Sequence, residues 1–180
     1  MTETTATELG VPTPDAMEQL GALIARQLRA GDVVLLNGEL GAGKTTLTRG
    51  IGAELGVRGA VTSPTFVLAR THPRAPQALQ EPREPPHGPR DAPLVHVDAY
   101  RLGSAVELDD LDIDYAGSIV VVEWGAGLLD GLTEDWLEVD IVRPTGSEAS
   151  TDELIEPRTV TITGHGVRWK DLGWVGASRD

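Results

Sequence analysis

Eight consecutive residues have the types and spacing of a phosphate-binding loop. The run Gly38-Glu39-Leu40-Gly41-Ala42-Gly43-Lys44-Thr45 fits G-x-x-x-x-G-K-[ST] at every fixed position. In such a loop the glycines let the backbone wrap around a phosphate, so that several N–H groups converge on it. Lys44 is then expected to reach the β- and γ-phosphates of a nucleotide, and the Thr45 hydroxyl to bind Mg²⁺. The plainer alternative is a glycine-rich turn that binds nothing.

Two carboxylates complete this chemistry, because Mg²⁺ prefers oxygen ligands and bridges the β- and γ-phosphates. Glu123 follows four apolar residues and Asp98 follows the mostly apolar run Leu94-Val95-His96-Val97, so both should lie at the C-terminal ends of strands, where α/β sheets bind ligands. We expect Glu123 to contact the Mg²⁺ shell and Asp98 to orient the attacking water or a metal-bound water. The spacing does not exclude the reverse assignment, or a loop-capping role for one of the two.

Three further residues are candidates for contacts with the nucleotide. Thr65, in Ser63-Pro64-Thr65, could sense the γ-phosphate or complete the Mg²⁺ shell, unless this is an ordinary Ser-Pro turn. Trp124 could stack near the nucleotide or pack in the core. Arg101 could pair with a phosphate or with an acidic neighbour.

Regular elements surround these residues in an order typical of an α/β protein. An apolar strand, 32–36, precedes the glycine loop, and a helix, 45–55, follows it and ends at Gly56. A second helix is capped by Thr13, begins at Pro14 and is stopped by Gly31, and a short third one covers 104–111. The other predicted strands are the second half of 61–69, 94–98, 119–123, 136–142 and 158–163.

The remaining segments have less regular character. Residues 1–12 are expected to be a flexible N-terminus, and 13–163 form one domain. Within it, 72–93 is so rich in proline that it predicts an extended insertion loop, with an arginine-bearing lid as the alternative. Residues 164–180 form a C-terminal tail that docks on the body of the domain or on a partner.

Composition narrows the function. The 180-residue chain has a net charge of −13, so most of its surface would repel a nucleic-acid backbone. It has no cysteine, no signal pattern and no apolar run long enough to span a bilayer, and we expect a soluble cytoplasmic protein. Asn37 is the only asparagine, so a guanine-reading Asn-Lys-x-Asp motif is absent and ATP is the expected nucleotide.

Other metal motifs fail on their spacing. Asp110, Asp112 and Asp114 open like a calcium loop, but Tyr115 stands where glycine is needed and Val121 where glutamate is needed. The four histidines have no zinc-ligand spacing.

Four blocks follow one another along the chain: Leu36 to Thr46, Ser63-Pro64-Thr65-Phe66, His96 to Leu102 and Val122-Glu123-Trp124. In this order they resemble the TsaE (YjeE) family, a group of small bacterial ATPases needed to make threonylcarbamoyladenosine in tRNA. The resemblance implies a P-loop NTPase-like, three-layer α/β fold with a mixed, mostly parallel central sheet. In it the Ser-Pro-Thr-Phe and His-x-Asp strands would run antiparallel.

The resemblance also implies a site and partners. ATP would bind at Gly41 to Thr46, with Glu39, Leu40, Thr65 and Trp124 as further expected contacts. Mg²⁺ would be bound by Thr45 and Glu123, with Asp98 essential for hydrolysis and Lys44 on the phosphates. The implied partners are TsaD and its scaffold TsaB, and tRNA only through that complex. The alternatives are a small-molecule kinase with an arginine-bearing lid, and an assembly factor whose hydrolysis is incidental.

Overall fold

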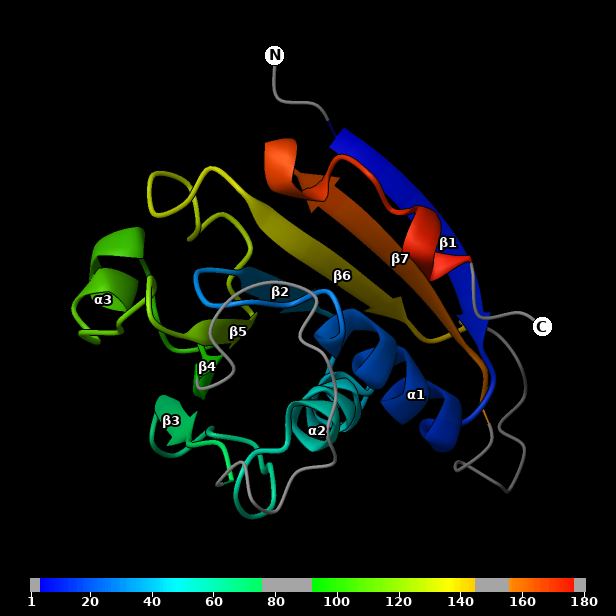
Figure 1. The fold of residues 1–180 in the computed structure, drawn as a ribbon, viewed down its shortest axis with the longest axis horizontal. Coiled ribbons are helices and arrows are strands. Elements are labelled where there is room, and N and C mark those ends of the chain that lie inside the picture. Colours follow the sequence, from blue (N-terminus) through cyan, green and yellow to red (C-terminus); the bar gives the residue numbers. More distant parts are fainter. Residues whose placement is uncertain (1–3, 76–91, 145–155, 177–180) are drawn as a thin grey trace.

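A twisted seven-stranded sheet forms the frame of the molecule (Figure 1). The structure is a computed structural model that describes residues 4–75, 92–144 and 156–176. Along the sheet the strand order is β1-β7-β6-β2-β5-β4-β3. The strands are β1 (Thr4–Val11), β2 (Val33–Asn37), β3 (Ala69–His72), β4 (Leu94–Asp98), β5 (Ile119–Glu123), β6 (Trp136–Val142) and β7 (Arg158–His165).

The central strands are parallel and the outer ones antiparallel. β2 pairs in parallel with both β5 and β6, and β5 with β4. β3, β7 and β1 join by antiparallel pairing at the two sides. The predicted mixed sheet with a parallel centre is therefore confirmed. Because parallel strands end at one edge, β2, β4, β5 and β6 deliver their C-terminal residues to the same side of the molecule.

Helices cover both faces of the sheet, which gives the predicted three layers. Figure 1 shows α1 (Pro14–Ala25) and α2 (Lys44–Leu55) on one face and the short α3 (Ala105–Asp109) on the other. Each face buries its own apolar cluster. One is built around α1, α2 and Trp169, and the other around Val97, Val122 and Leu108.

Local signals set the ends of the helices. The Thr13 side chain accepts a hydrogen bond from Ala16 N, and Gly56 ends α2 in the left-handed conformation, as predicted. The helix expected to continue to Gly31 instead ends at Ala25. Leu28 lies beyond that end and is still buried. It is apolar because it packs in the core, and not because the helix extends that far.

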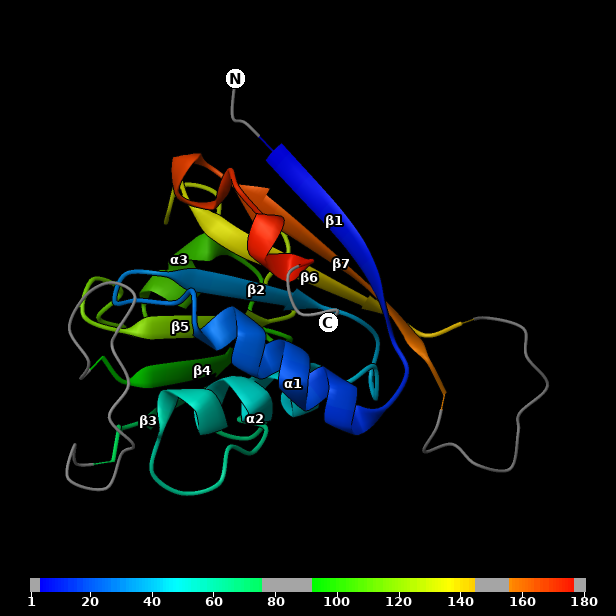
Figure 2. The ribbon, with the colours of Figure 1, turned by 45° about the vertical axis from the view of Figure 1, so that its right-hand side comes forward.

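The two long helices touch through glycines. A Cβ on Gly21 would stand 2.3 Å from Leu47 O, and one on Gly50 would stand 2.1 Å from Glu18 O. No larger residue fits at either position without moving a helix backbone. Figure 2 shows α1 and α2 side by side, and Met17 Cε lies 3.4 Å from where a Cβ on Gly43 would be. The N-terminal helix therefore packs directly behind the glycine loop.

The structure corrects two of the sequence predictions. Residues 4–11, expected to belong to a flexible N-terminus, form β1, which pairs with β7 over all eight residues. The strand expected in the second half of 61–69 begins only at Ala69, and Ser63 to Val67 lie outside any strand. Leu68 has a φ of 64°, which interrupts extended backbone just before β3. β3 does run antiparallel to β4.

The C-terminal segment docks on the body, in line with the plainer of its two expected roles. Two 3-10 helices, η3 (Val167–Trp169) and η4 (Gly173–Val175), follow β7, and Trp169 is fully buried. Arg168 binds the Asp32 carboxylate with two nitrogens, at 3.2 and 3.0 Å. Burial raises the pKa of Asp32, and the Arg168 contact opposes that shift.

One expected feature falls largely outside the described residues. Residues 76–91 hold most of the proline-rich insertion, which is also the arginine-bearing lid of the kinase alternative. Among the helices in the part of the chain that the structure describes, none has the length and apolar character needed to cross a bilayer.

His72 should make the fold sensitive to acid. It is 4% exposed, and burial, followed by the charges of His96 and Arg70, lowers its pKa. The unfolded imidazole titrates near 6.5, so the stability that neutral His72 contributes is present above that pH. It is lost as the pH falls below 6.5 towards the folded-state value. We expect the urea midpoint to drop more between pH 7.5 and 5.5 in the unaltered chain than in His72→Phe. Equal drops would contradict this.

Candidate phosphate-binding site

The glycine loop joins the end of β2 to the start of α2, as its motif requires. Its glycines adopt backbone angles that other residues avoid: φ is 154° at Gly38, 78° at Gly41 and 120° at Gly43. A Cβ on Gly38 would also stand 2.8 Å from Ile141 O. Gly43 is the N-cap of α2 and offers no side chain to the first turn of the helix. The free N–H groups of that turn are therefore left to a ligand.

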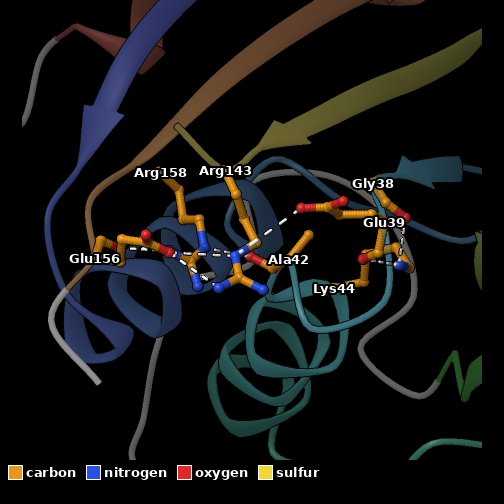
Figure 3. Close-up of polar contacts among 7 residues, drawn as sticks. All are labelled: Gly38, Glu39, Ala42, Lys44, Arg143, Glu156 and Arg158. Carbon is orange, nitrogen blue, oxygen red and sulfur yellow. Dashed lines mark hydrogen bonds and ion pairs between the residues drawn. The ribbon is translucent and has the colours of Figure 1, made fainter. Parts of the chain in front are cut away.

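Lys44 lies inside the loop and is only 6% exposed. Its Nζ donates to Gly38 O at 2.6 Å and to Glu39 O at 3.0 Å, so the ammonium group is held by the loop itself (Figure 3). Burial lowers the pKa of Lys44, while the charges of Glu123, Asp98 and Glu39 oppose that shift. The buried ammonium group and the backbone N–H groups of the loop favour an anion, whereas the nearby carboxylates favour a cation. The combination suits a phosphate that binds together with a metal ion.

The two predicted carboxylates lie side by side opposite Lys44. Asp98 and Glu123 are direct partners in the parallel register of β4 and β5, and they are 5% and 4% exposed. Asp98 Oδ1 accepts a hydrogen bond from Tyr100 N at 3.0 Å, so this carboxylate also caps the turn after β4. Glu123 Oε1 lies 2.9 Å from Nε2 of His96, a buried residue of β4 whose contact the sequence did not reveal.

Trp124 follows Glu123 and turns towards the lysine. It has a φ of 60°, and Lys44 Nζ lies 4.1 Å from its ring centroid, a cation–π distance. Tyr100 packs edge-on against the same indole at 5.4 Å. Trp124 is partly buried, and its ring belongs to the wall of the site and not to the core.

Thr65 and Leu40, both expected at the nucleotide, are exposed. The Thr65 hydroxyl lies 2.6 Å from that of Ser63, and its carbonyl accepts a hydrogen bond from Arg101. Arg101 thus connects the turn after β4 to the loop before β3. Leu40 forms the tip of the glycine loop and is 88% exposed.

Three charged residues at the loop were missed from the sequence. Arg143 follows β6, Arg158 begins β7 and Glu156 lies just before it; all three come to the outer side of the glycine loop (Figure 3). The available signal was that Arg143 directly follows a predicted strand, and so could lie at the ligand edge of the sheet.

The donor set fits Mg²⁺ held together with a phosphate better than a metal held by protein alone. No group of three or more His, Cys, Asp or Glu side chains gathers around a possible ion in residues 4–75, 92–144 and 156–176. Mg²⁺ usually keeps several waters and takes one or two carboxylates plus phosphate oxygens. Thr45, Glu123 and Asp98 could supply that number of oxygens.

The glycine loop joins a central parallel strand, β2, to a helix, and acids stand at the ends of β5 and β4, the next two strands in the sheet. This arrangement defines a P-loop NTPase-like fold. Comparison with known proteins narrows this class. The family profile described as "Threonylcarbamoyl adenosine biosynthesis protein TsaE" matches residues 11–151. The chain belongs to the TsaE family, and the resemblance noted from the motif blocks is confirmed.

Individual relatives agree with this assignment. A "tRNA threonylcarbamoyladenosine biosynthesis protein TsaE" from Streptomyces coelicolor is 55% identical over 156 residues, which are 85% of this chain and 93% of that protein. A protein of the same name from Bacillus subtilis is 31% identical over 162 residues, 88% of this chain and 86% of the relative. Among solved structures, Bacillus subtilis YdiB superposes with a TM-score of 0.64 at 26% identity. The match covers 93% of this chain and 90% of YdiB.

Proposed function

We propose that this chain binds ATP with Mg²⁺ and hydrolyses it to drive or reset the machinery that makes threonylcarbamoyladenosine in tRNA. One observation carries the proposal: a lysine buried in a glycine loop, facing two adjacent buried carboxylates at the ends of β4 and β5. The family name of the relatives supplies the pathway.

Each residue has a distinct role in this proposal. The loop amides from Gly41 to Thr46 bind the phosphates, and Lys44 turns its ammonium group to the β- and γ-phosphates. Thr45 and Glu123 would hold Mg²⁺, which would supply positive charge to the phosphate oxygens. Asp98, fixed by Tyr100 N, orients the attacking water or a metal-bound water. His96 keeps one oxygen of Glu123 in place.

The proposed partners are proteins, TsaD and TsaB, with tRNA reached only through them. The net charge of −13 supports this, because an acidic surface repels RNA but can dock on a protein. Exposed apolar side chains also surround the site, among them Leu40 in the glycine loop, Phe66 before β3 and Tyr100 after β4. Phosphoryl transfer is slow until the charge of the transition state is stabilised, and a partner can supply the missing group.

Hydrolysis should therefore depend on the partners. We expect phosphate release by the purified chain to be slow and to rise by at least about tenfold when TsaB, TsaD and tRNA are added together, since a group supplied in trans can accelerate such reactions far more than this. Equal rates with and without them would refute the coupling. Transfer of label from γ-labelled ATP to a small metabolite, in place of free phosphate, would favour the kinase alternative.

A further inference from the structure

An arginine from the antiparallel half of the sheet contacts the backbone of the glycine loop. Arg158, the first residue of β7, places its Nε 3.1 Å from Ala42 O, across 116 positions of sequence (Figure 3). Ala42 is 1% exposed, and the Arg158 side chain is 15% exposed. The contact is therefore a charge-assisted hydrogen bond shielded from water, the kind that holds a group in one orientation.

Arg158 is itself held by an acid at the same end of β7. Its Nη1 donates to Glu156 O at 2.6 Å and lies 3.3 Å from Glu156 Oε2. The same carboxylate oxygen accepts from Arg143 at 3.0 and 3.2 Å. Arg143 also lies 3.9 Å from Glu39 of the loop. Two guanidinium groups bridged by one carboxylate thus line one side of the glycine loop (Figure 3).

Peptide geometry carries the effect of this contact into the site. Ala42 C=O and Gly43 N–H belong to one planar trans peptide unit, so they point in opposite directions. With the carbonyl fixed on Arg158, the N–H is directed away from the arginine. The unit joins Ala42 to Gly43, and Gly43 lies in the left-handed region with a φ of 120°, where rotation of the unit meets less steric resistance than at a residue with a side chain.

We propose that Arg158 is a positioning residue for phosphate binding, which fixes the Ala42–Gly43 peptide so that the Gly43 N–H faces the phosphate. A cationic donor on the carbonyl also polarises the amide, which makes its N–H a stronger donor. Glu156 keeps the guanidinium in place. The inference rests on the proposed function, because it needs a phosphate in the loop, but it assigns a role to a residue far outside the motif.

Inorganic tripolyphosphate is the probe that isolates this role, because it has phosphates but no base or ribose. By calorimetry in the presence of Mg²⁺, we expect Arg158→Gln to lower the affinity for tripolyphosphate and for ATP by the same factor. That factor should be about tenfold, the size of one lost charge-assisted contact. Arg158→Lys keeps a cation within reach of Ala42 O and should recover part of that loss. A purely structural role would not produce this partial rescue at equal stability.

Arg168→Gln is the matched control. Arg168 also bonds a carboxylate, Asp32, and a backbone carbonyl, Gln27 O, but it does so at the opposite end of β2. We expect this variant to lower the urea midpoint without changing affinity for tripolyphosphate. The urea midpoints of all variants are measured in parallel, so that lost stability is not mistaken for lost affinity.

Two results would overturn the inference, and they differ from failure of the proposed function. If the unaltered chain and both Arg158 variants bind tripolyphosphate with equal affinity, the role of Arg158 is refuted and the proposed function still stands. Affinity that falls in Arg158→Gln and Arg168→Gln alike, in proportion to stability, would do the same. If the unaltered chain binds neither ATP nor tripolyphosphate, the nucleotide site itself is refuted and the role of Arg158 with it.

Discussion

Lys44→Ala should weaken ATP binding by about 10- to 100-fold, because a charge-assisted contact to a phosphate in a water-poor site is worth roughly 1.5–3 kcal/mol. Lys44 is almost completely buried and already bonds two carbonyls of the loop that it serves. Without its charge, Asp98 and Glu123 lose the attraction of a buried cation and would repel an incoming triphosphate more strongly. Calorimetric titration with ATP and Mg²⁺ measures the loss directly.

The chain offers a clean control for this experiment. Lys170 is the only other lysine, and it is exposed near the C-terminus, after η3. Lys170→Ala removes the same charge from the chain and should leave ATP affinity unchanged. If Lys44→Ala bound ATP as tightly as the unaltered chain, the nucleotide could not lie in the glycine loop.

Glu123→Gln should lower hydrolysis by about 100-fold or more while ATP affinity changes little. Groups that stabilise charge developing in a transition state typically contribute 10²–10³ to the rate. The amide keeps an oxygen for the 2.9 Å contact with His96, so the local packing survives while the charge is lost. Single-turnover measurement of phosphate release, next to an equilibrium titration with ATP, separates the two effects.

Glu138→Gln is the matching control, because Glu138 is another strand glutamate with a histidine partner. Its Oε2 lies 2.6 Å from His165 Nε2, on β6 and β7. We expect it to leave phosphate release unchanged. In reconstituted tRNA modification, Glu123→Gln should stop repeated cycles. Continued modification by this variant would favour the assembly-factor alternative, in which nucleotide binding suffices.

The parts of the site that could be predicted are those encoded locally. The glycine loop is defined by residue types within eight positions, and the ends of β4 and β5 by apolar runs that stop at a carboxylate. Those signals place Lys44, Asp98 and Glu123 correctly at one sheet edge, although their chemical roles stay predictions. The four motif blocks also identify the class of protein, because each is a short run of residues at a fixed place in the order.

The parts that could not be predicted depend on contacts between distant segments. Arg158 reaches Ala42 across 116 residues, and no local pattern encodes that approach. Residues 4–11 are mostly polar and small, so their strand character is created by pairing with β7, more than 140 positions away. Likewise, β3 begins only after Leu68, because the positive φ of Leu68 interrupts the extended backbone. The apolar run from Phe66 to Ala69 gives no sign of that angle.

The edge position of β1 has a practical consequence for anyone who shortens this protein. The profile match begins at residue 11, and trimming the chain to that boundary would remove all of β1 except Val11, and with it one of the two strands that pair with β7. Seven of the eight β7 residues, Thr159 to His165, would then present an unpaired edge to solvent, a template for fibrous or amorphous self-association. Expression vectors for crystallography or binding assays should therefore retain residues 1–10, with any purification tag placed ahead of them.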